Sequence, residues 1–157
     1  MTDDQFLSEL DECSLHPADF DHLGHVRLAW ICLQRYPMGQ AVERTCDTIR
    51  IYATHLGAPD KFHRTVTEAL MHLLAQGGAA DRTRSFHDFI SANDELIAQT
   101  RIRLSDHYSA ALLSSAEARA AFVAPDRAPL ASLPHSVYKP IMPSAIQQNY
   151  SDDKDGP

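Results

Sequence analysis

The sequence lacks long hydrophobic runs and any excess of positive charge. No apolar stretch approaches the roughly 20 residues that a membrane-spanning helix requires. The acidic N-terminal segment MTDDQFLSELDE has neither the basic nor the apolar region of a signal peptide. The chain carries 14 basic and 21 acidic residues, and the resulting net charge of −7 disfavours nucleic acid and anionic membranes as partners.

Cysteines and the common catalytic motifs are also scarce. Cys13, Cys32 and Cys46 are an odd number without a CxxC pair, which fits a reducing cytoplasm better than a disulfide framework. The sequence has no glycine-rich phosphate loop, no GxSxG and no HExxH, so kinase, dehydrogenase and hydrolase assignments have no motif support. Its 157 residues are the length of one domain that folds without a disulfide or a metal.

Helical periodicity dominates the first 125 residues. The spacing of apolar residues predicts an all-α fold, a compact bundle of five or six helices, and no strand. Pro17 and Pro59 suit the first turn of a helix, and Gly57 suits a helix end. The expected helices cover residues 17–35, 39–55, 60–75, 85–91, 94–108 and 114–123.

Proline becomes frequent at the C-terminal end. Five prolines lie between residues 125 and 143, and they exclude helix and favour extended chain laid over a surface. The last residues are polar and offer little to bury. We therefore expect a helical domain over residues 1–125, a strap packed on it over residues 126–143, and a disordered tail over residues 144–157.

The unusual component is histidine, with nine residues. Helical spacing places four of them on faces that carry apolar residues and so predicts that they point into the core. These four are His22, His25, His63 and His107. By the same spacing His72 and Glu68 share an outward face, and His87 points away from the core. Arg27 and Arg101 are candidates for binding an acidic substrate group, with ordinary surface charge as the simpler interpretation.

The four inward histidines predict a metal centre. A buried neutral imidazole needs partners for both nitrogens, and a transition metal satisfies several imidazoles at once. Imidazoles without thiolates suit iron, copper or zinc. We expect His22, His25, His63 and His107 as ligands, three or four in number. His22 is also a candidate acid or base, and the Thr67 hydroxyl a candidate for orienting a bound ligand.

Two functions from different classes follow. The first is a small cytoplasmic metalloenzyme that performs oxygen- or redox-dependent chemistry with iron or copper on a small-molecule substrate, with zinc-dependent hydrolysis as a variant. The second is a helical interaction module or metal-responsive module without enzymatic activity, in which the histidines are buried, hydrogen-bonded structural residues. A homodimer is expected on base rates alone.

Three sequence blocks resemble a family of small bacterial helical proteins. The blocks are FDHLGHVRLAW, KFHRTVTEAL and DHYSAALLSSAEARAAFVAPDRAPL, and together they span about residues 15–130. The resemblance implies that His22, His25, His63 and His107 belong to the family's motifs. It implies no reaction. Arg64 stands where the family typically has an acidic residue.

Overall fold

The computed structural model describes residues 1–130, and within them the all-α prediction is confirmed. These residues form nine α-helices, more than the five or six expected. The sequence did not predict the helices over Asp3–Asp11 and Ala110–Leu113, and the one helix expected over residues 94–108 is two helices. Two 3-10 turns, η1 (Pro17–Asp19) and η2 (Pro59–Lys61), precede α2 and α4. The helices are α1 (Asp3–Asp11), α2 (His22–Arg35), α3 (Met38–His55), α4 (Arg64–Gln76), α5 (Phe86–Ala92), α6 (Asp94–Ala98), α7 (Thr100–Ser105), α8 (Ala110–Leu113) and α9 (Ala116–Ala120).

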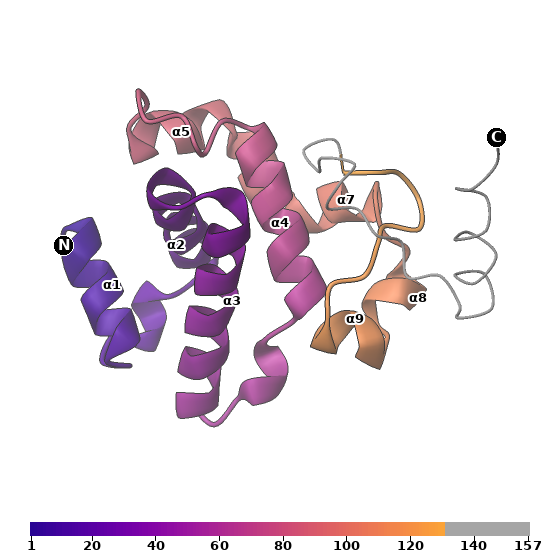
Figure 1. Cartoon of the computed structure of the whole chain (residues 1–157), viewed down its shortest axis with the longest axis horizontal. Helices are drawn as coiled ribbons and strands as arrows, with labels where there is room; N and C mark the ends of the chain where they lie inside the picture. Colours follow the sequence, from indigo (N-terminus) through magenta and orange to yellow (C-terminus); the bar gives the residue numbers. More distant parts are fainter. Residues whose placement is uncertain (131–157) are drawn as a thin grey trace, which may run out of the picture.

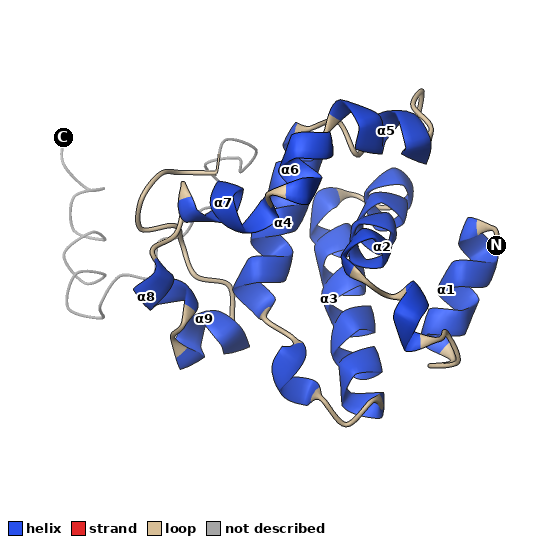
Figure 2. Cartoon of the chain, turned by 180° about the vertical axis from the view of Figure 1, so that it is seen from behind, coloured by secondary structure: helices blue, strands red, loops and turns tan. Residues whose placement is uncertain are grey.

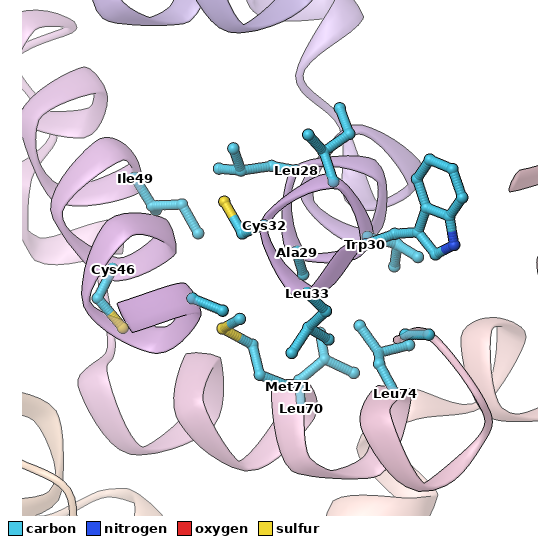
Figure 3. Close-up of a cluster of buried hydrophobic side chains, with 14 of the residues drawn as sticks. Leu28, Ala29, Trp30, Cys32, Leu33, Cys46, Ile49, Leu70, Met71 and Leu74 are labelled. Atoms are coloured by element: carbon cyan, nitrogen blue, oxygen red, sulfur yellow. The ribbon is translucent and has the colours of Figure 1, made fainter. Parts of the chain in front are cut away.

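The main core lies where α2, α3 and α4 meet. Figure 3 shows side chains from all three helices converging, with α2 contributing on several sides. Val26, Leu28 and Ile31 of α2 are almost completely buried, so this helix is apolar nearly all round. The labelled residues of this cluster are Leu28, Ala29, Trp30, Cys32 and Leu33 of α2, Cys46 and Ile49 of α3, and Leu70, Met71 and Leu74 of α4.

Helix α4 runs through the middle of the molecule (Figure 1). Its Leu70, Met71 and Leu74 belong to the main core, whereas Ala69 and Leu73 belong to a second buried cluster on its other side. That second cluster is completed by Leu104, Tyr108, Ala118, Val123 and Leu130. The helix is therefore covered on two sides rather than one.

Capping side chains fix the helix starts. The expected helix over residues 17–35 is two elements, because η1 ends at Asp19 and Asp21 then caps α2 by accepting a hydrogen bond from the Gly24 N–H. Helix α1 was not expected. It begins with a capping box, in which Thr2 and Gln5 satisfy each other's backbone N–H groups.

The helix expected over residues 94–108 is broken into α6 and α7 at Gln99, whose φ of −121° and ψ of 38° are not helical. The break exposes the Ile97 carbonyl, which then accepts hydrogen bonds from the side chains of His22 and Thr100. Seen from behind, the short segments α5, α6 and α7 follow one another, and α7 contacts α4 (Figure 2). His22, 75 residues away in sequence, therefore stabilises the break.

The first five residues of the expected strap return to the bundle. Leu130 is buried in the second cluster, and the Arg127 N–H donates to the His107 carbonyl. The rest of the strap and the expected tail, residues 131–157, lie outside the described residues. Within residues 1–130 no helix is long and apolar enough to cross a membrane.

Candidate functional site: a histidine pocket between α2, α3, α4 and α7

A pocket of about 210 Å³ opens between α2, α3, α4 and α7. We call it the histidine pocket. Half of its wall is apolar and consists of Ala29, Ile49, Val66, Leu70, Met71 and Leu104. The polar half consists of His22, His25, Thr45, Thr67, Thr100 and Arg101. No acidic side chain is among the described residues that line it, although the chain carries a net charge of −7.

Arg101 lines three hollows at once and has no ion pair or hydrogen bond with a described residue. Besides the histidine pocket it lines two adjoining hollows, one of about 440 Å³ beside α6 and one of about 590 Å³ between α4, α7, α8 and α9. The other ten arginines of residues 1–130 each form an ion pair or hydrogen bond with a described residue. Arg101 is therefore the one arginine of residues 1–130 that uses none of its five N–H donors on a described protein group.

His22 lines the pocket from the first turn of α2 and is exposed to solvent, so the expectation that it points into the core is wrong. It lies at the first residue of the helix, where its ring reaches across to α6 and α7 rather than into the main core. Its Nε2 lies 2.8 Å from the Ile97 carbonyl oxygen and 3.1 Å from Thr100 Oγ1. Because a carbonyl oxygen only accepts, Nε2 carries the proton and donates it. In the neutral ring Nδ1 keeps its lone pair, and it makes no hydrogen bond with a described residue.

His25 lies one turn further along α2 and is half-buried. Its Nδ1 lies 2.7 Å from the Asp21 carbonyl oxygen, and its ring stacks on Phe20. Burial lowers the pKa of His25 below its ordinary value, so the ring is neutral at pH 7. The structure thus brings two of the four predicted ligands, His22 and His25, into one pocket.

His63 is placed elsewhere and has both ring nitrogens engaged. It is the N-cap of α4, where Nδ1 accepts from the Val66 N–H at 3.1 Å. Its Nε2 donates to the Leu113 carbonyl at 2.7 Å. These are the hydrogen bonds of a structural histidine, and they leave no lone pair for a metal. Its ring lines the larger hollow between α4 and α8 rather than the histidine pocket.

His107 also binds backbone. It follows the end of α7, and its Nδ1 donates to the Ala128 carbonyl at 3.0 Å. Within residues 1–130 there is no group of three or more His, Cys, Asp or Glu side chains suited to holding a metal ion. The four residues do not fit a shared metal centre in this arrangement.

The expectation that His72 and Glu68 lie on an outward face of α4 is wrong. His72 is only 4% exposed, and Glu68 has a side chain only 15% exposed. The reason is the second buried cluster, which covers the side of α4 that a one-sided amphipathic helix would present to water.

Burial raises the pKa of Glu68, whose carboxylate lies 3.6 Å from Arg64 Nε. Arg64 also pairs with Glu43 of α3 at 2.6 Å, so this residue joins two helices.

The remaining candidates divide clearly. Thr67 lines the histidine pocket together with His22, and its hydroxyl donates to the His63 carbonyl while its lone pairs stay available. Arg27 pairs with Asp3 at 2.9 Å and is therefore an ordinary paired surface charge. Sequence reasoning named Arg101 but gave it the same weight as Arg27. The sequence could not show which of the two arginines is paired, because neither has an acidic residue three or four positions away on its own helix.

Comparison of the chain with protein-family models, with curated proteins and with solved structures finds no match.

Proposed function

We propose that the chain binds a small organic anion, a carboxylate or a phosphate, in the histidine pocket. The observation that carries this proposal is Arg101, an arginine without an ion pair beside a neutral His25 in a pocket whose described lining holds no acidic side chain. Guanidinium groups recognise carboxylate and phosphate oxygens through paired, charge-assisted hydrogen bonds. Arg101 is exposed to solvent, so its guanidinium is accessible to an anion that enters the pocket.

The apolar lining and the volume of the pocket indicate what the rest of the ligand is like. Six apolar residues offer contact to a hydrophobic group, which matches the general form of small-molecule sites, an apolar pocket with a few fixed polar groups. The volume of about 210 Å³ lies below the roughly 300–1,000 Å³ of sites for drug-sized ligands. The ligand is accordingly a compact metabolite with one apolar part and one anionic part.

The test is ligand binding by the full chain and by two arginine variants. Aromatic and aliphatic carboxylates and the corresponding phosphate monoesters are screened by thermal unfolding and by ligand-observed NMR. Binding to the folded state stabilises it by RT ln(1 + L/Kd), where L is the free ligand concentration, so the melting temperature rises with the logarithm of this concentration once it exceeds Kd. We expect Arg101→Gln to lose at least tenfold in affinity, because a charge-assisted bidentate contact is lost.

The matched control is Arg103→Gln on the same helix, since Arg103 is exposed and pairs with Glu95 at 3.6 Å. This variant should bind like the parent chain. Equal affinity of all three proteins for every anion, or no binding by any of them, overturns the proposal. The preference between carboxylates and phosphates decides which anion the pocket takes.

A transition-metal ion is a second candidate occupant. The observation that favours it is that His22 Nδ1 and His25 Nε2 both remain without a hydrogen-bond partner among the described residues of the pocket wall. Iron or copper bound there would supply redox chemistry, and zinc would supply hydrolytic chemistry. Elemental analysis of protein purified without a His tag tests it. Metal that is lost in His22→Ala and His25→Ala but kept in His63→Ala supports this occupant.

A further inference from the structure

His25 is held in one orientation by two contacts. Its ring lies flat on Phe20, with 4.0 Å between the ring centroids and 18° between the planes. Its Nδ1 lies 2.7 Å from the Asp21 carbonyl oxygen. The Asp21 backbone is itself fixed, because its side chain caps α2 through the Gly24 N–H. The imidazole of His25 therefore cannot turn without losing both the stack and the hydrogen bond.

This arrangement selects one tautomer. A carbonyl oxygen has no proton to give, so Nδ1 must carry the proton and Nε2 must hold the lone pair. Nε2 makes no hydrogen bond with any described residue. Nε2 is not among the buried unpartnered atoms, so solvent reaches it in the free protein, and a ligand that displaces this water must supply a donor or leave the acceptor unpaired.

Resting on the proposed function, we infer that His25 Nε2 receives a hydrogen bond from the ligand, so that the ligand is an organic acid that also carries a hydroxyl or N–H group. Arg101 presents only donors and recognises the negative group, whereas His25 presents only an acceptor and recognises the proton-bearing group. These two groups of the pocket wall have opposite requirements. A plain hydrophobic acid satisfies one of them, and a hydroxy acid or an N–H-bearing acid satisfies both.

His25 is thus a specificity-determining residue. An acid that lacks the donor leaves Nε2 desolvated and unpaired, and sites built around such a contact discriminate strongly against analogues that lack it. A methyl ether of the same acid has nearly the same shape but no proton to donate. It should be rejected together with the unsubstituted acid.

The experiment uses two matched sets of probes: phenylacetate, mandelate and 2-methoxy-2-phenylacetate, and benzoate, 3-hydroxybenzoate and 3-methoxybenzoate. Binding is measured with the full chain, with His25→Phe and with His25→Gln. Phenylalanine keeps a flat ring on Phe20 but removes the acceptor, and glutamine returns an acceptor oxygen. Circular dichroism verifies that each variant is folded.

In at least one set we expect the parent chain to bind the hydroxy acid at least tenfold more tightly than both analogues. His25→Phe should lose this preference and His25→Gln should recover part of it. A second measurement requires no variant: long-range ¹H–¹⁵N spectra of the parent chain should show His25 Nε2 shifting with the hydroxy acid and not with its methyl ether.

The outcomes separate the two proposals. Acids that bind through Arg101 without any preference for the hydroxyl, or with a preference that survives in His25→Phe, overturn the role of His25 and leave the anion site standing. Failure of every acid to bind the parent chain overturns both. An unchanged His25 Nε2 signal in the presence of a bound hydroxy acid also overturns the role of His25.

Discussion

At the scale of single residues, the four histidines expected as metal ligands are distinguished by their hydrogen bonds. His63 uses both ring nitrogens within the fold, whereas His22, His25 and His107 each use one. Helical spacing predicted that all four point inward, but it carries no information about the backbone carbonyl that each ring meets. The carbonyls that meet His22, His63 and His107 lie 75, 50 and 21 residues away in sequence, and only the folded chain brings them to the rings.

Replacing His63 should destabilise the protein in two separable steps. His63→Asn keeps an N-cap side chain at the start of α4 but loses the hydrogen bond to the Leu113 carbonyl. His63→Ala loses both and should lower the free energy of unfolding by about 1–2 kcal/mol more than asparagine does. Urea unfolding measures the difference. Equal losses in the two variants would contradict the capping role.

His72 should make the stability depend on pH. Burial lowers the pKa of His72 to about 4 from an ordinary value of 6.5. Between these pH values the unfolded chain takes up a proton at this position and the folded chain does not. The free energy of unfolding therefore falls as the pH is lowered from about 6.5 towards 4, by at most about 1.4 kcal/mol per pH unit from this one group.

The comparison that isolates His72 is the slope of unfolding free energy against pH in two variants. His72→Leu should have a shallower slope than the parent chain over pH 4–6.5. His87→Leu should keep the parent slope, because His87 is exposed on α5. If all three slopes coincide, His72 does not reside in a desolvating site.

At the scale of elements, prolines, glycines and capping residues predicted most helix positions within a few residues. Helix α3 ends at His55 as expected, just before Gly57, whose φ of +72° suits glycine. The break at Gln99 has no such marker. It depends on the side chains of His22 and Thr100, which satisfy the Ile97 carbonyl, and His22 comes from another helix. The position of Arg101 in the pocket follows from that break, so the site was harder to predict than the fold.

Two glycine substitutions test how closely η1 approaches α2. A Cβ at Gly24 would lie 2.8 Å from the Asp19 carbonyl oxygen and 3.3 Å from Phe20 Cδ1. We expect Gly24→Ala to lower the free energy of unfolding, although alanine is favoured over glycine in a helix by about 1 kcal/mol. Gly39→Ala in α3 meets nothing within 4 Å and should gain up to about 1 kcal/mol. Urea unfolding of both variants measures this contrast, and a gain in Gly24→Ala would contradict the close approach.

At the scale of the whole molecule, residues 126–130 hold the second cluster closed. Leu130 is 3% exposed, the Asp126 carboxylate accepts from Ser109, and the Ala128 carbonyl accepts from His107. A chain ending at residue 125 should therefore be less stable than one ending at residue 130 by at least about 2 kcal/mol. Thermal and urea unfolding of the two truncated chains measure this, and identical stabilities would show that the segment contributes nothing.

Helix α4 supplies side chains to both buried clusters and to the histidine pocket, and Gln76 at its end is its only exposed residue. Residues 1–130 consequently cannot be separated into two parts that fold independently. A cut before or after α4 leaves one of the two fragments without this helix and therefore with an uncovered apolar face. The chain also has little freedom to diverge in α4. Most substitutions in this helix would alter the packing of both buried clusters, so we expect more sequence variation among homologues in α1, α5 and α6 than in α4.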